Sequence, residues 1–470
     1  MQTELPQDFV RLMHEHYDEA TADALCRALD ATEPDVSIRL NPRKLSTEEV
    51  LACRPDLEPV PWCPGAFFLP FRPVFTFDPL LHAGAYYVQE AASMYIAQVI
   101  VNSEGLRVKD KSNNLEDKSK PDSSSQSSGA GGTLFTLNSS LLTLHSSLVA
   151  LDLCAAPGGK STLVQSLLPE GSLLISNEPV PKRAQVLREN MQKWMMGQPQ
   201  EAPRCIVTQK YPHEFGLLSG CVDLLLTDVP CSGEGMFRKD DVARQEWSLE
   251  NVAKCQQRQR NILSDIWHVL KPGGLLIYST CTFNRYEDED NVRWICQEFG
   301  GELLMERHFL PGRDRGEGFY VAAIKAPGRN EEQGARNEEQ GARSKGRGAG
   351  SKRSVDYLLK SLAPCSLPLA PLPSAEEAPR IELSYDEALQ YLRREALRVE
   401  APRGPVTLCY RGLVLGPGKG VGNRINNLYP EAWRIRTTYT TPFSLLGTDR
   451  ETSRQGDARF ITRDEVFYHT

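Results

Sequence analysis

Two cysteines follow apolar runs in matching positions of this sequence, and an aspartate accompanies one of them. Cys231 stands in DVPCSGEG at 228–235, beginning with Asp228, and Cys281 stands in STCTFN at 279–284. A thiolate can attack an electron-poor ring carbon such as C6 of cytosine, which makes C5 nucleophilic enough to accept a methyl group. A carboxyl group at the N3/N4 edge would steady protonation at N3. Two cysteines and one aspartate therefore fit a covalent C5 methylation of a pyrimidine.

The other interpretation of these cysteines is structural. The chain has 12 cysteines among 470 residues, with no C-x-x-C pair and no Cys/His cluster of zinc spacing, so we expect no metal. Without a secretory signal, free thiols are the better interpretation than disulfides. Any single cysteine is ordinarily a small core residue. That reading is less persuasive for Cys231 and Cys281, which share matching settings beside a carboxylate.

The segment LDLCAAPGGKST at 151–162 predicts a loop that binds a nucleoside-bearing cofactor. An apolar run leads into Gly158 and Gly159, which let the backbone approach a ligand, and then into a helix start that offers N–H donors. Glu178 ends the next apolar run, where a carboxylate can accept both hydroxyls of a ribose. The alternative, a tight turn with a solvated glutamate, becomes minor once the two cysteine turns are added.

The elements that must position these residues form an alternating pattern across 149–325. Short apolar runs (LVALDLC, SLLISNE, VDLLLTD, GLLIYST) alternate with helical patterns. This predicts βαβ units and a doubly wound α/β domain with a parallel sheet. Asp228 then lies at the carboxyl end of a strand, the edge where such sheets bind ligands.

Both ends of the chain have patterns of their own. Residues 7–29 predict an amphipathic helix or helix pair, and 37–44 a strand that runs into a turn. Ser384 and Glu387 form the capping box of a helix predicted over 384–398. A strand- and turn-rich stretch, 405–470, predicts a small β-rich domain.

The overall composition limits the class of protein. Hydrophobic residues make up 40% and charged residues 24%, as in a soluble globular protein. The net charge of −7 argues against a polycation that coats nucleic acid, but it leaves room for a local basic face. Neither a secretory signal nor a membrane-length apolar run is visible, so we expect a cytoplasmic protein without membrane contact, and a monomer.

Five motifs occur in order and carry a resemblance. LDLCAAPGGKS, DVPCSGEGMFRKD and STCTFNRYEDEDNV, with YYVQEAASM at 86–94 and GEGFYVAAI at 316–324, closely resemble the Nol1/Nop2/Sun family of RNA cytosine-C5 methyltransferases. The GEGMFRKD extension and GNRINNLYPEAWRIR at 422–436 are most similar to the bacterial 16S rRNA methyltransferase F branch, which carries a PUA-like C-terminal domain. The resemblance implies S-adenosylmethionine as the methyl donor and RNA as the substrate.

The resemblance also implies the domains and their fold. It predicts a Rossmann-like S-adenosylmethionine methyltransferase sheet with a small α+β N-terminal domain and a β-rich PUA-like C-terminal domain. The predicted parts are an N-terminal RNA-binding-type domain at 1–85, a catalytic domain at 86–325 with a flexible Ser/Gly-rich insertion at 103–133, a disordered linker at 326–379, and the PUA-like domain at 380–470.

Roles for individual residues follow from the same resemblance. Cys281 is the expected nucleophile, Cys231 the residue that helps to release the product, and Asp228 lies beside both cofactor and base. Glu178 is expected to bind the ribose. Relatives often carry an acid near the adenine where this chain has Gln209, which we expect to replace that contact. The residues expected to wrap the cofactor are Cys154, Ala155, Ala156, Pro157, Gly158, Gly159 and Lys160.

RNA must also be held outside the reacting site, because the target base has to leave its stack. Tyr429 and Trp433 are candidates for stacking on bases. The alternative for each basic residue is a solvated surface charge. The candidate phosphate contacts are Arg39, Arg43, Arg238, Lys239, Lys419, Arg424, Arg434 and Arg436.

Three other functions compete with methylation of small-subunit rRNA. A tRNA is the second candidate substrate within the same chemistry. A nonenzymatic RNA-binding or ribosome-assembly factor would be marked by loss of Cys281 or of the CAAPGGK loop, and both are present. A nicotinamide-dependent oxidoreductase would require G-x-G-x-x-G, which is absent, and would leave the cysteine pair unexplained.

Overall fold

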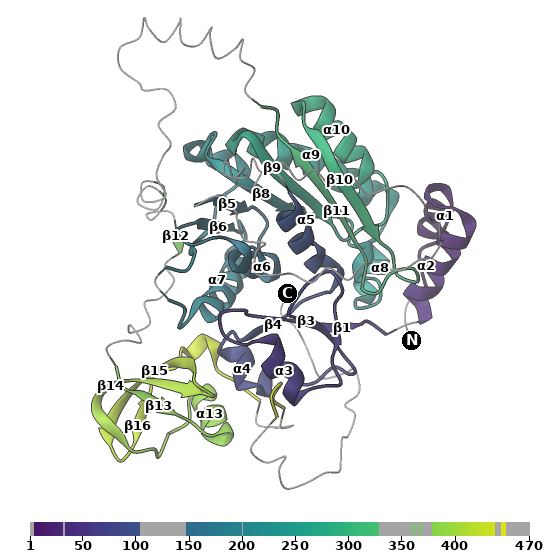
Figure 1. Ribbon diagram of the computed structural model, residues 1–470. Coiled ribbons are helices and arrows are strands. Elements are labelled where there is room, and N and C mark those ends of the chain that lie inside the picture. Colours follow the sequence, from purple (N-terminus) through teal and green to yellow (C-terminus); the bar gives the residue numbers. More distant parts are fainter. Residues whose placement is uncertain are drawn as a thin grey trace, which may run out of the picture.

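A large mixed sheet forms the middle of the molecule (Figure 1). The computed structural model describes residues 4–31, 33–103, 147–199, 201–328, 378–437 and 443–447, with positions 358, 362, 366 and 367. The order of the strands is β10-β11-β9-β8-β5-β6-β7-β12. Their bounds are β5 Val149–Asp152, β6 Leu173–Asn177, β7 Arg204–Thr208, β8 Val222–Asp228, β9 Leu270–Thr280, β10 Glu302–Phe309, β11 Phe319–Lys325 and β12 Ser366–Leu367.

The direction of the strands creates a switch point at β5. Strands β9, β8, β5, β6 and β7 run parallel, whereas β10, β11 and β12 are antiparallel to their neighbours. The chain moves outward from β5 through β6 to β7, and then returns to the other side of β5 to form β8 and β9. Ligands of open α/β sheets bind outside the carboxyl ends at such a point. The predicted doubly wound sheet is confirmed.

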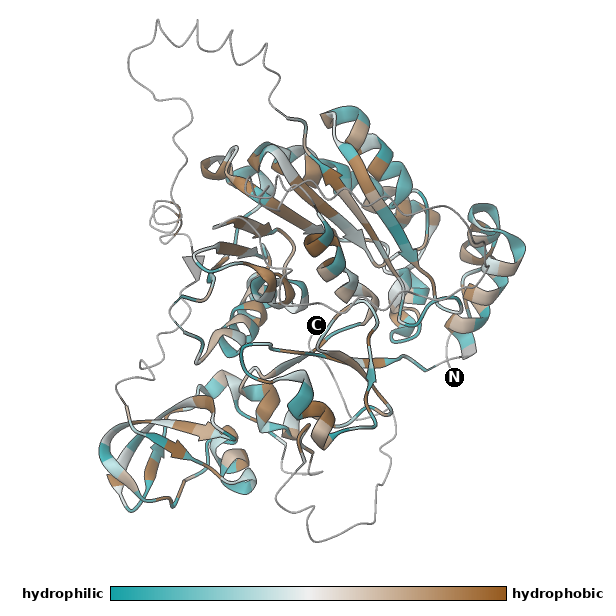
Figure 2. Cartoon of the chain, viewed as in Figure 1, coloured by the Kyte–Doolittle hydropathy of each residue, from teal (hydrophilic) through white to brown (hydrophobic). Residues whose placement is uncertain are grey.

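Helices cover both faces of this sheet. Alternate residues of β8 face opposite sides: Leu224 and Leu226 join one apolar cluster, and Leu225 joins another. The middle strands are largely brown in Figure 2, as expected for a sheet buried on two faces. Helices α5 (Ile96–Asn102), α6 (Gly159–Leu167) and α7 (Pro181–Met195) pack on the first face, and α9 (Leu249–Ile266) and α10 (Glu289–Phe299) on the second.

The N-terminal part contributes a helix pair and a small sheet. The pattern at 7–29 is resolved as two helices, α1 (Gln7–His16) and α2 (Glu19–Ala31), beside α8 (Asp241–Glu246) in Figure 1. The antiparallel sheet has the order β2-β3-β1-β4. Its elements are β1 Val36–Leu40, α3 Thr47–Cys53, β2 Glu58–Pro59, β3 Ala66–Leu69, α4 Pro79–His82 and β4 Tyr86–Val88.

The C-terminal part is a third sheet with one helix. Ser384 caps α13 (Tyr385–Leu392), and the predicted capping box with Glu387 is present. The helix ends before 398 because Arg394 has a φ of +61°, which a right-handed helix does not allow. The sheet order is β13-β14-β15-β16, with strands β13 Arg380–Glu382, β14 Ala401–Tyr410, β15 Leu413–Gly422 and β16 Ile425–Asn427.

The C-terminal sheet and the N-terminal sheet share one apolar core, which includes residues of β1, β3, α4, α13 and β14. Asp78, fully buried, accepts hydrogen bonds there from the backbone N–H of Leu445 at 2.9 Å and the hydroxyl of Tyr86 at 2.8 Å. None of the described helices is both long and apolar enough for a membrane span. Most of the predicted insertion and linker lies outside the described residues.

Replacing Asp78 should weaken the junction between these two sheets. The Asp78 carboxylate accepts from three donors, because Leu80 N–H also donates to it, at 3.0 Å. In Asp78→Asn the new amide N–H₂ would face at least one of these donors and lose that hydrogen bond. We expect the free energy of unfolding in urea to fall by about 1–3 kcal/mol. Asp56→Asn, which alters a carboxylate in an exposed pair with Arg54, is the control and should change it by less than about 0.5 kcal/mol. An unchanged free energy of unfolding in Asp78→Asn would show that these hydrogen bonds do not stabilise the junction.

Candidate active site

The structure brings the two cysteine turns together. Cys231 follows β8 and Cys281 directly follows β9, and these two strands pair in parallel with Asp228 opposite Ser279. The sulfur atoms of the two cysteines lie 3.2 Å apart, and both residues are half-buried free thiols. The contact with the Cys281 thiol, together with burial, raises the pKa of Cys231 well above its usual value. Cys231 therefore stays protonated in this arrangement.

Asp228 is held between the glycine loop and the Cys281 strand. Its Oδ2 lies 2.7 Å from Nζ of Lys160, and its Oδ1 accepts a hydrogen bond from the Ser279 hydroxyl at 2.8 Å. Burial lowers the pKa of Lys160, but the charge and hydrogen bond of Asp228, together with the nearby Cys281 and Asp152, outweigh this effect and leave that pKa above the usual value. Lys160 is thus a fixed cation beside the carboxylate.

The loop from Cys154 to Lys160 is fixed by its neighbours. The backbone N–H of Ala155 donates to the carbonyl of Asn177 at 2.8 Å, and the side chain of Asn190 donates to the carbonyl of Pro157 at 2.9 Å. Gly158 has a φ of +120°, which other residues adopt only with strain, and it leads into α6. The Ala156–Pro157 peptide bond is cis. The backbone at the carboxyl end of β5 is thus held in one shape.

Glu178 and Gln209 follow the next two strands of the sheet. Glu178 is 1% exposed, and its carboxylate accepts a hydrogen bond from Val180 N–H at 3.0 Å and lies 3.3 Å from Arg183. Gln209 is exposed, and its side-chain amide donates to the carbonyl of Pro179 at 3.4 Å. Both residues therefore border the turn between β6 and α7.

Asn177, at the carboxyl end of β6, is a site residue that the sequence analysis did not predict. Its side-chain amide donates to the carbonyls of Leu153 at 3.0 Å and Lys210 at 2.9 Å, and its oxygen accepts from the Thr208 hydroxyl at 2.9 Å. It thereby ties the ends of β5, β6 and β7 together. The available signal was a fully polar side chain at the end of an apolar run, one position before Glu178.

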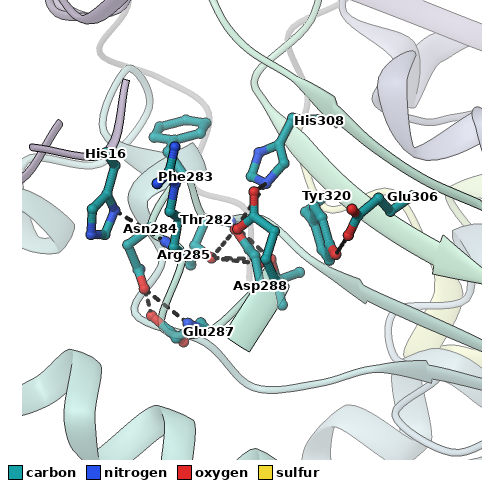
Figure 3. Close-up of polar contacts among 12 residues, drawn as sticks. His16, Thr282, Phe283, Asn284, Arg285, Glu287, Asp288, Glu306, His308 and Tyr320 are labelled. Carbon is teal, nitrogen blue, oxygen red and sulfur yellow. Dashed lines mark hydrogen bonds and ion pairs between the residues drawn. The ribbon is translucent and has the colours of Figure 1, made fainter. Parts of the chain in front are cut away.

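An acidic cluster around Asp288 contacts the Cys281 turn through Thr282 (Figure 3). Asp288, fully buried, accepts hydrogen bonds from the hydroxyls of Thr280 at 2.5 Å and Thr282 at 3.2 Å. His308 lies 3.6 Å from Asp288 and 3.4 Å from Glu289. The potential metal-ligating atoms of Asp288, Glu289 and His308 lie within 4.8 Å of one another. Through the hydrogen bonds of Asp288 to Thr280 and Thr282, this cluster supports the turn.

Burial of the side chain shows that two of the predicted RNA contacts are wrong. Arg39 is 2% exposed and donates to Thr162 Oγ1 at 2.6 Å and Gln89 Oε1 at 3.1 Å, so its guanidinium is already used inside the protein. Arg238 is 6% exposed and pairs with Glu317 at 3.2 Å. Neither side chain is available to a phosphate.

The two aromatic candidates are wrong for the same reason. Tyr429 is 1% and Trp433 8% exposed, and both pack in the core that the N- and C-terminal sheets share. Neither ring face is open to a base. Arg43 is half-buried. The candidates that do lie on the surface are Lys239, Lys419, Arg424, Arg434 and Arg436.

The fold and the site define a class. Solved structures resemble this chain over about two thirds of its length. PH0851 has a TM-score of 0.53 and 19% identity over 68% of this chain and 66% of that one. NSun6 from Pyrococcus horikoshii with SFG has a TM-score of 0.52 and 16% identity over 69% of this chain and 98% of that one. The protein has the fold of the S-adenosylmethionine methyltransferases, with additional N- and C-terminal domains.

Family models identify the group within this class. The 16S rRNA methyltransferase RsmB/F model matches residues 139–325, the RsmF N-terminal domain matches 5–91, and the RsmF PUA domain matches 378–435. The chain belongs to the RsmB/F family of 16S rRNA methyltransferases, which confirms the fold class and the resemblance found in the sequence.

Curated relatives carry the name ribosomal RNA small subunit methyltransferase F. The one from Pectobacterium atrosepticum is 30% identical over 62% of this chain and 56% of its own length. The one from Aliivibrio fischeri is 28% identical over 84% of this chain and 90% of its own length. The match thus spans little more than half of the first relative and nearly all of the second.

Gly235 tests how closely the two turns must approach. Its N–H donates to the carbonyl of Cys281 at 2.7 Å, and a Cβ at this position would lie 2.8 Å from that carbonyl oxygen. Gly235→Ala should displace the Cys281 turn, and a misplacement of about 1 Å lowers turnover about 100-fold. Single-turnover methylation assays would measure this.

Gly216→Ala is the matched control, because a Cβ there meets nothing within 4 Å. It should leave turnover unchanged. Full activity of Gly235→Ala would show that the close approach of the turns is dispensable.

Proposed function

We propose that this protein is an S-adenosylmethionine-dependent methyltransferase that modifies C5 of a cytosine in small-subunit rRNA through a covalent adduct. The observation that carries the proposal is the pair of thiols, Cys231 and Cys281, 3.2 Å apart at the edge where the glycine loop and Asp228 meet. One thiol is needed to activate the ring and a second helps to restore it. A buried structural pair would not require the neighbouring carboxylate and cation.

The residues at the ends of β5 and β6 fit the cofactor. Glu178 offers a buried carboxylate to the ribose hydroxyls, and the backbone of the loop from Cys154 to Lys160 offers a close approach at Gly158. Oδ1 of Asp152 is buried at the same edge and has no hydrogen-bond partner among the described residues. When bound, the cofactor supplies the methyl group. Gln209 would face its adenine end.

The chain's own residues then divide the work on the base. The Cys281 thiolate attacks C6 and forms a carbon–sulfur bond, while Asp228 faces the N3 edge and steadies the proton there. Once C5 carries the new methyl group, its proton must leave to a base, and the Cys281–C6 bond breaks as the ring double bond returns. We assign this base to Cys231 in its thiolate form. Once Cys281 is bonded to C6, the contact with the Cys281 thiol that raises the pKa of Cys231 in the resting protein is gone, so Cys231 can lose its own proton to solvent and accept the proton from C5. Cys281 stands in the Thr-Cys motif, where the family that the sequence resembles carries its nucleophile, so we assign the attack on C6 to Cys281.

Small-subunit rRNA is the preferred substrate because the family models and the curated relatives carry that name. The exposed cations Lys419, Arg424, Arg434 and Arg436 lie in the C-terminal part, where they would contact phosphates. The target cytosine must be unpaired or flipped to reach Cys281.

Cys281→Ala should abolish methyl transfer, because it removes the thiolate to which the attack on C6 is assigned. The affinity for S-adenosylmethionine should be nearly unchanged, since the cofactor loop follows β5 whereas Cys281 follows β9. Transfer of a labelled methyl group to rRNA and calorimetric titration of the cofactor measure the two quantities. Cys53→Ala, at an exposed free thiol, is the control. Normal turnover by Cys281→Ala would refute the nucleophile assignment.

Cys231→Ala should trap the enzyme on its RNA. Without the second thiol the Cys281–C6 bond persists, and we expect a denaturant-resistant adduct on gels under turnover conditions. Adding Cys281→Ala to the same chain should remove the adduct. If Cys231→Ala turns over without any adduct, the release role is incorrect.

A further inference from the structure

Each of the two cysteine turns is followed by a buried glutamate that the reaction scheme does not use. Glu234 follows Cys231 and is fully buried. Its carboxylate accepts hydrogen bonds from the backbone N–H of Phe283 at 2.6 Å and from the side chain of Asn284 at 2.8 Å. Both donors belong to the turn of the other cysteine, Cys281. Glu234 therefore reaches across from one turn to the other.

Glu287 makes the reciprocal connection. It follows Cys281 and is also fully buried. Its carboxylate accepts hydrogen bonds from the backbone N–H of Ser232 at 3.1 Å and from the side chain of Gln259 at 2.7 Å. Ser232 is the neighbour of Cys231. The Asn284 side chain also donates to Glu287, at 2.9 Å (Figure 3), so it links the two glutamates.

This arrangement is costly. Burial and the charge of Glu287 raise the pKa of Glu234 to about 7, and burial raises the pKa of Glu287. Within the described ranges, neither carboxylate has an ion-pair partner. Two neighbouring buried acids are unfavourable compared with apolar side chains of the same size. The hydrogen-bond donors to these two carboxylates, however, include backbone amides close to the cysteines. Only a side chain that accepts hydrogen bonds can bind these amides and so fix the distance between the two turns.

We propose that Glu234 and Glu287 are positioning residues that hold the thiols of Cys231 and Cys281 in contact. Each does so by accepting a hydrogen bond from a backbone amide of the opposite turn. They touch neither base nor cofactor. Their consequence for catalysis rests on the proposed function, since a scheme in which two thiols act on one ring needs both at a fixed separation. The geometric part of the proposal concerns the resting protein alone.

An arsenical probe tests the geometry without turnover. Phenylarsine oxide bridges two adjacent thiols: two arsenic–sulfur bonds form, and the oxygen leaves with the two thiol protons as water. The full chain should take one bridge between Cys231 and Cys281, identified by peptide mass spectrometry and absent from Cys231→Ala. In Glu234→Gln and Glu287→Gln the amide N–H₂ faces at least one hydrogen-bond donor in either orientation, and the affinity for the probe should fall at least tenfold.

Asp78→Asn is the matched control, because Asp78 is a buried carboxylate that also accepts from backbone amides but lies in the N-terminal part. It should keep the bridge at the affinity of the parent chain. The midpoint of thermal unfolding is measured for every variant. Unchanged bridging in both glutamate variants would overturn the proposal. So would loss of bridging that occurs only where the chain no longer folds.

A catalytic readout separates this inference from the proposed function. Both glutamate variants should lose at least tenfold in kcat, with KM for RNA and the Kd for S-adenosylmethionine within twofold of the parent. If the parent bridges the probe and the variants do not, while no chain methylates cytosine, the positioning role stands and the proposed reaction fails. If the variants lose the bridge but keep full kcat, the thiol contact is not needed and the positioning role is wrong.

Discussion

Strands β8 and β9 lie side by side in parallel, with Asp228 opposite Ser279, and the site depends on this pairing. Neighbouring strands are about 4.8 Å apart, so residues that leave two paired strands at the same level begin within contact distance. Cys231 and Cys281 leave the sheet in this way, and the Ser279 hydroxyl joins the strand of Cys281 to Asp228. The apolar faces of both strands, buried under helices on two sides, keep this register fixed.

The rest of the chain is built around that edge. Phe9 of α1 packs against Phe237 and Phe283, each a few residues beyond one of the cysteines, with ring centroids 5.0 and 6.4 Å away. Tyr17 donates a hydrogen bond to the carbonyl of Phe283 at 2.7 Å, and His16 accepts one from the backbone of Arg285 at 3.1 Å. The N-terminal helix pair therefore covers the outer side of both turns.

The sequence was most informative where structure is local. The ends of apolar runs located Glu178, Asp228 and Cys281 at strand ends, and Ser384 with Glu387 marked a helix start, because these signals depend on nearby residues. Burial of charged and aromatic side chains was not predictable in the same way. Arg39 and Tyr429 are buried by contacts between parts of the chain that are distant in sequence, so residue type alone wrongly suggested surface roles.

The contacts that set the spacing of the site are long-range as well. Glu234 meets Phe283, and Ser232 meets Glu287, although helices α8 and α9 and strand β9 separate the two turns in the sequence. A local sequence pattern cannot predict such long-range hydrogen bonds. The two cysteines could be recognised because each follows an apolar run.

Bisulfite sequencing of rRNA and tRNA, from cells that carry this gene and cells that lack it, detects the proposed product, 5-methylcytosine. If the proposed reaction takes place, one cytosine of small-subunit rRNA is protected only when the gene is present. If no cytosine in either RNA changes between the two strains, the proposed reaction is contradicted.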